Sequence, residues 1–245
     1  IFTGGFGISA SLLGKPDIGL LSATEMTDRV RYICRAVTVP VLADMDTGYG
    51  NELNVMRTVE DAVAAGASGV ILEDQEWPKR CGHFDGKRVI ARDEHEAKIR
   101  AAVKARGDDE LVIVARTDAR SVLGLDEAMT RGRAYAEAGA DAIFVEAPQS
   151  REELETIAEE LQAYPLMANI IEGGKTPNLP VKELEAMGYK LCAFALSALL
   201  AGTHAMRETL RHLKEHGHTG DLGESFSFSD FAEVIGLHDH LEKNT

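Results

Sequence analysis

Short apolar runs alternate with helical patterns along this chain of 245 residues, at a spacing of roughly 30 residues, the length of a βαβ unit. The alternation predicts right-handed βαβ units that form one parallel sheet. The runs are almost continuously apolar, as expected of strands buried on both faces. Strands are predicted at 1–3, 39–46, 70–72, 111–118, 142–147, 166–171 and 189–196. Helices are predicted at 22–36, 54–65, 92–106, 125–138, 151–162, 181–187, 198–215 and 228–241, and a Gly/Ser-rich loop at 4–11.

The residues that end these runs distinguish a closed barrel from an open sheet. In an open doubly wound sheet, only strands beside the crevice should end in polar residues, whereas all strands of a barrel end at one mouth. Here run after run ends in a charged or amide side chain: Asp44, Asp46, Glu73, Asp74, Arg116, Asp118, Glu146, Asn169 and Glu172. The sequence therefore predicts an α/β fold of the (β/α)8 TIM-barrel type, with the doubly wound sheet as the alternative.

The apolar runs supply seven strands, one fewer than a closed barrel of this type needs. Because the first run begins at Ile1, we expect that the first β/α unit is absent from this chain. Residues 1–222 are expected to form the barrel, and residues 223–245 a separate C-terminal helical segment.

Charge and cysteine content exclude several classes of protein. The formal net charge of -14, with no basic run to offset it, argues against a nucleic-acid partner. Cys34, Cys81 and Cys192 fit neither a disulfide framework nor a zinc pattern, which favours a reducing, cytoplasmic setting. No apolar stretch reaches the roughly 20 residues needed to span a bilayer, so no membrane partner is expected.

Three acidic residues form a candidate metal site. Asp44 and Asp46 are two residues apart, which in a regular strand places both carboxylates on one face. With Glu73 they make an oxygen-rich cluster that suits a hard divalent cation such as Mg2+, with Mn2+ as the alternative ion. The competing interpretation is that both aspartates cap loops and helix N-termini.

Arg116 follows four apolar residues, so it is expected at or near burial, where a guanidinium needs an acidic partner. Glu146, Asp118 or a substrate carboxylate would serve, and a purely structural ion pair is the alternative. Gly4 and Gly5 follow the first strand, where backbone N–H groups could approach an anion, although glycines also make ordinary turns.

Cys81 stands between Arg80 and His83 and close to Lys79, in a loop rich in charge and glycine. The cationic neighbours predict a lowered thiol pKa and proton-transfer chemistry. An inert buried thiol is the usual fate of a lone cysteine, but these neighbours argue against burial in an apolar core. We therefore expect a reactive thiol on a loop that closes over the mouth.

Four motifs carry a family resemblance: DMDTGYG (44–50), LEDQEWPKRCGH (72–83), VARTDAR (114–120) and NIIEGGKTP (169–177). In this order and spacing the chain resembles the isocitrate lyase/phosphoenolpyruvate mutase superfamily, in its branch of 2,3-dimethylmalate lyases, methylisocitrate lyases and carboxyphosphonoenolpyruvate mutases. The resemblance implies a (β/α)8 barrel whose last helix is exchanged between subunits. It also implies a homotetramer, assembled as a dimer of helix-swapped dimers.

The resemblance further implies a role for each matching residue. Asp44 and Asp46 match the Mg2+ site, with Glu73 supporting the metal through water. Arg116 matches an arginine that steadies a developing oxyanion, and Cys81 a thiol that protonates a departing carbanion. The residues expected to assist catalysis from the same gating loop are Lys79 and His83. Those expected to face the substrate are Gly4, Gly5, Arg80, Glu146, Asn169, Glu172 and Ser197.

The loop sequence separates branches of the superfamily. Members that form or cleave phosphonates generally carry asparagine in place of the cysteine, so KRCGH favours the lyases. Carboxyphosphonoenolpyruvate mutase is the exception, because its loop is lyase-like and it shares the EGGKTP form. Phe84 and Gly173-Gly174 depart from methylisocitrate lyases, which disfavours a tricarboxylate. Gly4 replaces a substrate-contacting Ser or Thr, and Ala195 replaces the Ser of oxaloacetate-hydrolysing relatives.

The function expected from these features is Mg2+-dependent C–C bond cleavage. The substrate would be a small 2-hydroxy dicarboxylate of the 2-alkylmalate or methylisocitrate type, and the products a 2-oxo acid and a second carboxylic acid. The alternatives are a carboxyphosphonoenolpyruvate phosphonomutase, an oxaloacetate hydrolase or decarboxylase, and a catalytically idle barrel that binds a metabolite or assembles.

Overall fold

The computed structural model describes residues 1–223 and 227–242 and contains two compact units, Ile1–Ser197 and Ala198–Thr245. The first unit holds parallel strands that pair in chain order. They are β1 (Phe2–Thr3), β2 (Leu42–Asp44), β3 (Gly69–Glu73), β4 (Val112–Thr117), β5 (Ala142–Val145), β6 (Leu166–Ile170) and β7 (Tyr189–Phe194). Between them run α2 (Ala23–Ala36), α3 (Glu52–Ala65), α4 (Arg92–Arg106), α5 (Arg120–Leu123), α6 (Leu125–Glu137), α7 (Arg151–Glu160) and α8 (Val181–Met187).

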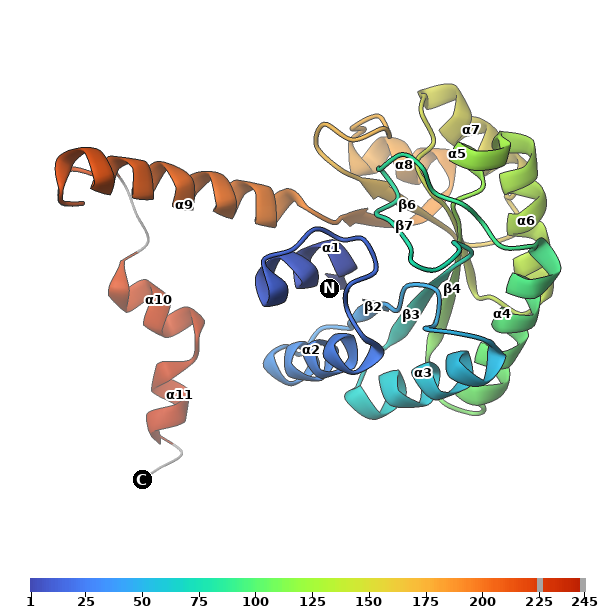
Figure 1. The fold of residues 1–245 in the computed structure, drawn as a ribbon, viewed down its shortest axis with the longest axis horizontal. Helices are drawn as coiled ribbons and strands as arrows, with labels where there is room; N and C mark the ends of the chain where they lie inside the picture. The colour runs from blue at the N-terminus through green and yellow to red at the C-terminus, as the bar shows by residue number, and fades with distance from the viewer. Residues whose placement is uncertain (224–226, 243–245) are drawn as a thin grey trace. The chain divides into compact units, whose positions relative to one another are not determined.

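The strands curve into a nearly closed barrel, and the connecting helices form its outer layer (Figure 1). This arrangement confirms the predicted α/β fold of the TIM-barrel type, because an open doubly wound sheet would not keep its strands in chain order. The absence of a first β/α unit stays a prediction.

The two faces of each strand bury different apolar layers. In β3, Val70 and Leu72 pack outward against the helices, whereas Ile71 between them points into the barrel. The inner layer consists of Ile71, Val114, Ala142, Phe144, Met167 and Ala193, with Phe2 and Leu42 packed against it. This period of two is that of a β-strand, and the interior it fills is a packed core and not a pore.

Local capping sets where the helices begin and end. Ser22 starts α2 with a capping box, in which its hydroxyl accepts from the Glu25 N–H and the Glu25 carboxylate accepts from the Ser22 N–H. Asn51 and Asn54 make the equivalent pair at the start of α3. That helix ends at Gly66, whose φ of 91° lies in the left-handed region that favours glycine.

The prediction of a Gly/Ser-rich loop at 4–11 is wrong, because the chain is helical from Gly5 onward. Gly5–Ile8 forms a short helix, α1, and Ser9–Leu13 continues it as a π-helical turn. Glycine disfavours helices, but tertiary contacts decide here, since Ile8 is buried in the outer core. The Ser9 hydroxyl, also buried, donates to the Lys15 and Pro16 carbonyls.

Two further predicted boundaries differ from the structure. The strand predicted at 39–46 is confined to Leu42–Asp44, because Asp46 has a φ of 51°. The helix predicted at 228–241 is two helices, α10 (Phe228–Val234) and α11 (Leu237–Glu242), separated near Gly236 with its φ of 69°.

The second unit carries apolar side chains on its helix surfaces. Its described helices are α9 (Ser197–His216, which begins at the last residue of the first unit), α10 and α11. The large exposed apolar residues include Met206, Leu210, Leu213, Phe228, Phe231 and Val234. Residues 224–226 and 243–245 of the predicted C-terminal segment lie outside the described residues, and both that segment's boundary at 222 and its exchange stay predictions. Across the described residues, no helix has the length and hydropathy that crossing a bilayer would take.

One buried carboxylate joins the strand ends to the helical layer. Asp74, directly after β3, accepts hydrogen bonds at Oδ2 from Thr117 Oγ1 (2.7 Å), Tyr135 Oη (2.8 Å) and Arg131 Nη1 (3.0 Å). Its Oδ1 accepts from the Asp118 backbone N–H at 2.8 Å. The ends of β3 and β4 are thereby fastened to α6, and the backbone of Asp118 is held in place.

Replacing Asp74 by alanine should lower the free energy of unfolding by about 3–5 kcal/mol, because Arg131 would lose its buried carboxylate partner. Urea denaturation would measure the change. Glu76→Ala is the control, since Glu76 pairs with Arg88 at the surface and should contribute less than about 1 kcal/mol. Equal effects of the two substitutions would contradict the importance given to Asp74.

Candidate active site

The mouth of the barrel is lined by the residues that lie two positions after the inner apolar layer. Because side chains alternate along a strand, position i+2 points inward like position i, one step nearer the mouth. The pairs are Phe2 and Gly4, Leu42 and Asp44, Ile71 and Glu73, Val114 and Arg116, Phe144 and Glu146, Met167 and Asn169, and Ala193 and Ala195. The apolar core and the polar site are thus consecutive layers of the same barrel.

Asp46 reaches the mouth by a different route from the one predicted. The two aspartates do not share one face of a regular strand, because β2 ends at Asp44 and Asp46 has a φ of 51°. The Asp46 N–H instead donates to Asp44 Oδ1 at 3.2 Å, which turns the chain at this point. The Asp46 carboxylate then lies 2.6 Å from Lys79 Nζ.

Lys79 is a buried cation between two aspartates. Its Nζ lies 2.7 Å from Asp17 Oδ1 as well as 2.6 Å from Asp46 Oδ1. Burial alone would lower the pKa of Lys79, but Asp46, Glu73 and the other nearby acids hold it above its usual value. Lys79 is therefore a fixed positive charge at the edge of the carboxylate cluster.

Asp44, Asp46 and Glu73 fit a hard divalent cation. Burial raises the pKa of Asp46 to about 7 although Lys79 opposes it, and burial raises the pKa of Glu73 well above its usual value although Arg116 opposes it. Asp46 Oδ2 and Glu73 Oε1 are buried without a hydrogen-bond partner among the described residues. A cluster of carboxylate oxygens short of positive charge is the kind of site that Mg2+ occupies.

Arg116 is held by acids on both sides and by an aromatic ring. It donates through Nε and Nη2 to the two oxygens of Asp118 at 2.9 and 3.0 Å, and its Nη1 lies 3.3 Å from Glu73 Oε2. Its guanidinium carbon is 5.3 Å from the centre of the Phe144 ring. Because Asp74 holds the Asp118 backbone, the position of Arg116 depends on the network beneath the site.

The segment 79–87 closes over the mouth through contacts with several elements. The Cys81 N–H donates to the Asp17 carbonyl at 3.1 Å. His83 accepts the Lys175 N–H at Nδ1 (2.9 Å), which leaves its ring proton on Nε2, 3.2 Å from Glu146 Oε1. Lys87 Nζ lies 3.2 Å from Asp118 Oδ1.

Gly82 has to be glycine in this closed arrangement. A Cβ at this position would overlap Glu146 Oε1 and lie 2.5 Å from Arg116 Nη2. Gly5 is similarly restricted, since its Cβ would lie 2.9 Å from Lys79 Nζ, and its N–H donates to Asp44 Oδ2 at 3.3 Å. Both glycines let the backbone approach charged groups that a side chain would displace.

The Cys81 thiol faces the same small cavity as the acids and Arg116. Burial raises its pKa to about 11, so the lowered pKa predicted from its cationic neighbours is wrong. Lys79 pairs with acids, and Arg80 is directed to the Asp85 carbonyl. A hydrogen bond from the His83 backbone and the charge of Arg116 lower the pKa of the thiol, but they do not outweigh the desolvation of a thiolate. The thiol is consequently a proton carrier at neutral pH.

The cavity enclosed by these groups has a volume of about 40 Å³. Its lining includes Gly4, Gly5, Asp17, Asp44, Cys81, Gly82, Arg116, Glu146, Asn169 and Ala195. It has room for a few water molecules, whereas pockets for small ligands measure roughly 300–1,000 Å³. A small dicarboxylate does not fit this space while the segment 79–87 keeps these contacts.

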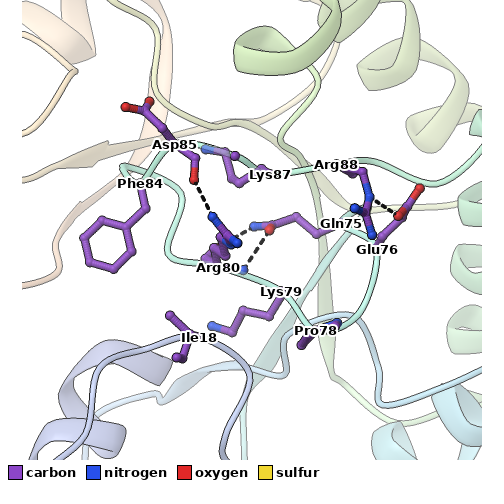
Figure 2. Close-up of a pocket in the computed structure, with 11 residues that line it drawn as sticks. Ile18, Gln75, Glu76, Pro78, Lys79, Arg80, Phe84, Asp85, Lys87 and Arg88 are labelled. Atoms are coloured by element: carbon purple, nitrogen blue, oxygen red, sulfur yellow. Dashed lines mark hydrogen bonds and ion pairs between the residues drawn. The ribbon is translucent and has the colours of Figure 1, made fainter.

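Three predicted substrate residues lie away from this cavity. Arg80 is exposed on the outer side of the loop, where its Nη1 donates to the Asp85 carbonyl at 3.1 Å (Figure 2). It lines a separate surface pocket of about 540 Å³. Glu172 is exposed and accepts a hydrogen bond from Ser197 Oγ, so these two side chains are occupied with each other.

The structure adds Asp17, Gly82 and Lys87 to the site. No motif spacing connects Asp17 to the loop, from which it is separated by about 60 residues of chain. Lys87 is buried, donating to the Gly82 carbonyl beside Asp118. Lys87 directly follows the charged loop. The rule that buried charges need partners is the one argument that could have connected this lysine to the acids of the site.

The model of the family phosphoenolpyruvate phosphomutase matches residues 1–214. The chain belongs to this family. Carboxyvinyl-carboxyphosphonate phosphorylmutase, chloroplastic, of Arabidopsis thaliana is 48% identical over 246 residues, covering 98% of this chain and 72% of that protein. The 2,3-dimethylmalate lyase of Eubacterium barkeri is 46% identical over 238 residues, 97% of this chain and 82% of that protein.

A solved structure of oxaloacetate acetylhydrolase, in complex with the inhibitor 3,3-difluorooxalacetate, superposes with a TM-score of 0.95 at 38% identity. It covers 99% of this chain and 83% of that chain. The predicted membership of the isocitrate lyase/phosphoenolpyruvate mutase superfamily is confirmed. The relatives of this phosphoenolpyruvate phosphomutase family member are named for at least three different activities. Overall similarity to them therefore does not identify the reaction.

Gly82→Ala should lower kcat/KM by about 10² or more, because the added methyl group would prevent the loop from closing against Glu146 and Arg116. Steady-state kinetics would measure the loss, and thermal unfolding should change little. Gly7→Ala is the matched control, because a Cβ at Gly7 meets nothing within 4 Å. Full activity in Gly82→Ala would show that this closed loop is not the reacting arrangement.

Proposed function

We propose that the protein is a Mg2+-dependent C–C lyase that cleaves a 2-hydroxy dicarboxylate to a 2-oxo acid and a second carboxylic acid. The observation that supports this proposal most directly is the protonated Cys81 thiol, which faces the same cavity as Asp44 and Arg116. Within the class, a 2-alkylmalate is favoured over methylisocitrate because Phe84 and Gly173-Gly174 depart from the methylisocitrate lyase pattern.

Asp44, Asp46 and Glu73 would hold the divalent ion, which is Mg2+ with Mn2+ as the alternative. When bound, such an ion supplies Lewis-acid stabilisation of negative charge on substrate oxygen. The chain's contribution at this point is a rigid set of oxygens, since Asp44 is fixed by the Gly5 and Asp46 N–H groups.

Arg116 would stabilise the negative charge that develops on the 2-oxygen as the hydroxyl proton passes to one of the carboxylates that line the cavity (Asp17, Asp44 and Glu146), from which it would return to the Cys81 thiolate after turnover. Its guanidinium is pre-oriented by Asp118 and Glu73, so little reorganisation accompanies the reaction. The C2–C3 bond then breaks, C2 becomes the carbonyl carbon of the 2-oxo acid, and the electron pair passes to C3 as an enediolate of the second acid. Cys81 Sγ–H would donate its proton to C3, which completes the second product.

The raised thiol pKa suits this role. An acid with a pKa of about 11 stays protonated through the neutral and mildly alkaline range, yet it is far stronger than the conjugate acid of a carbanion. Closure of the loop would also exclude water that could protonate the enediolate from an uncontrolled direction.

Substrate entry requires several loop contacts to break together. Lys79 would leave Asp17 and Asp46, the Cys81 N–H would leave the Asp17 carbonyl, and Lys175 Nζ would leave Asp85, which it contacts at 2.5 Å. In the open state Arg80 could reach the mouth, which would restore the substrate contact predicted for it. Glu172 and Ser197 border the same end of β6 and β7.

A carboxyphosphonoenolpyruvate phosphonomutase is the second candidate, favoured by the 48% identity to the Arabidopsis thaliana phosphorylmutase. That reaction joins C3 to phosphorus, so it needs no proton at carbon. Oxaloacetate hydrolysis is less favoured although the solved acetylhydrolase superposes well, because Ala195 brings no hydroxyl group to the cavity that it lines.

We further propose that the protein assembles as a homotetramer of helix-swapped dimers. The support is the number of large exposed apolar side chains on the described helices of the second unit, including Leu210, Phe228 and Phe231. Such side chains are buried when helices pack against a neighbouring subunit.

Cys81→Ser should reduce turnover of the true 2-hydroxy dicarboxylate by about 10²–10⁴, because the proton donor is lost while the volume is nearly unchanged. Release of 2-oxo acid from a panel of malate derivatives would measure it, with Cys34→Ser as the matched control. In the parent enzyme, the rate should not fall with rising pH on account of Cys81 until the pH nears about 11, since the protonated thiol is the active form. Full turnover of the diacid by Cys81→Ser would overturn the proton-donor role of the thiol, whereas a phosphonate product seen by phosphorus NMR would favour the mutase.

Mg2+ together with oxalate should raise the melting temperature, as binding to the folded state stabilises it by about 2.7 kcal/mol at 100 times Kd. Asp44→Asn should abolish this shift, whereas the surface variant Asp61→Asn should keep it, since Asp61 makes an exposed contact with Arg57. Differential scanning fluorimetry would measure both. A shift that survives Asp44→Asn would place the ion elsewhere, and no shift in the parent, with no turnover on the diacid panel, would favour an idle barrel.

A further inference from the structure

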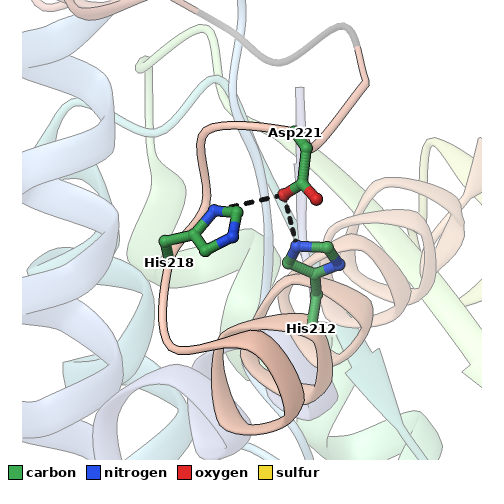
Figure 3. Close-up of side chains that lie close together, drawn as sticks. All are labelled: His212, His218 and Asp221. Carbon is green, nitrogen blue, oxygen red and sulfur yellow. Dashed lines mark hydrogen bonds and ion pairs between the residues drawn. The ribbon is translucent and has the colours of Figure 1, made fainter.

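Three metal-binding side chains converge at the end of α9, in a part of the chain that the proposed lyase activity does not use. His212 Nε2 lies 2.7 Å from Asp221 Oδ1, and His218 Nδ1 lies 3.3 Å from the same oxygen (Figure 3). One donor atom from each residue falls within 4.8 Å of the other two. This spacing would let all three side chains reach one ion directly.

The backbone brings these residues together over a short stretch of chain. His212 is on the last turns of α9, which ends at His216. Gly217 then takes a φ of 77°, a left-handed conformation that favours glycine and reverses the chain. The reversal returns His218 and Asp221 to the side of the helix that carries His212, as Figure 3 shows.

The hydrogen bonds around His218 place its unprotonated ring nitrogen beside Asp221. Nδ1 accepts the Gly220 N–H at 3.3 Å with its single lone pair, so a metal ion would replace this long contact. The neighbouring Asp221 Oδ1 is also an electron-pair donor. Two electron-pair donors 3.3 Å apart repel unless a proton or a cation lies near both.

The spacing also suits a tetrahedral ion. Bonds of about 2.0–2.2 Å to nitrogen and oxygen place neighbouring donors roughly 3.3 Å apart around tetrahedral zinc. The three donors need only small side-chain rotations to reach this spacing, and solvent can supply a fourth ligand because His218 and Asp221 are exposed. The His216 ring, stacked on His212 at 4.2 Å between centroids, fixes the plane of that imidazole.

We propose that His212, His218 and Asp221 bind a borderline transition-metal ion of the Zn2+ class. Two imidazoles and one carboxylate select such an ion over Mg2+, which prefers oxygen ligands and retains water. The site is therefore chemically distinct from the oxygen cluster of Asp44, Asp46 and Glu73. A metal ion bound at this site would hold the loop 217–221 against the end of α9.

The test uses the full chain, freed of metal with a chelator and then saturated with Mg2+ so that the oxygen cluster is occupied. Isothermal titration with Zn2+ should show one further site per chain. His218→Ala should weaken it by at least about tenfold, the smaller effect seen when even a supporting group around a metal is lost. His204→Ala, an exposed histidine on the same helix, is the matched control and should bind as the parent does.

Two further measurements keep the proposal falsifiable if a variant misfolds. Zn2+ should slow backbone hydrogen exchange in residues 212–222 of the parent chain, and the volume-matched Asp221→Asn should lose this protection. With Co2+ as the probe, the absorption should be that of nitrogen and oxygen ligands. Thiolate charge-transfer bands would place the ion on a cysteine and overturn the proposal. If the parent bound no Zn2+, the proposal would also be overturned, and the three side chains would form only His–Asp ion pairs.

Discussion

Buried carboxylates crowd the carboxyl ends of the strands, and the need to neutralise them shapes most of this protein. They are Asp17, Asp44, Asp46, Glu73, Asp74, Asp118 and Glu146, and the buried cations among them are Lys79, Lys87, Arg116 and Arg131. Lys79, Arg116 and Arg131 each bridge two acids, as Arg116 bridges Glu73 and Asp118, whereas Lys87 joins Asp118 to the Gly82 carbonyl. A buried charge without a partner is costly, so this network fixes strand ends, helices and loop relative to one another. Acids still exceed cations around Asp46 and Glu73, where burial raises the pKa of both carboxyl groups.

The same network couples loop closure to the position of the thiol. Asp17 contacts this part of the loop at two points. Its carboxylate pairs with Lys79, and its backbone carbonyl accepts a hydrogen bond from the Cys81 N–H. Closure thus delivers a cation to the acids and a thiol to the cavity in one movement. The two events cannot be separated, because the lysine and the cysteine are two residues apart on one turn of chain. Gly82 then allows the backbone to pass beside Glu146 and Arg116.

Much of the site was visible in the sequence because strand geometry is regular. A period of two carries each strand from an inner apolar residue to an inward polar one, so Asp44, Glu73 and Arg116 could be placed at one mouth from their strand ends alone. The period of two does not apply to Asp46, because a residue with positive φ is not part of a regular strand. Asp17 and the helical turn at 5–13 depend on tertiary contacts that no local pattern encodes. The direction of the Cys81 pKa shift was mispredicted for a related reason, since neighbouring charges can be read from sequence but desolvation cannot.

The same barrel carries out several reactions in the relatives of this protein. These reactions differ in which atom receives the electron pair that bond cleavage leaves behind. A phosphonomutase passes that pair to phosphorus and needs no proton at carbon. A lyase leaves it on carbon, where only a proton can end the reaction. In this protein a thiol kept protonated by burial faces the same cavity of about 40 Å³ as Asp44 and Arg116. Such an acid serves a lyase directly, but the loop of carboxyphosphonoenolpyruvate mutases is lyase-like as well. The thiol and the 2% difference in identity between the two relatives therefore leave the choice to the product that the enzyme forms.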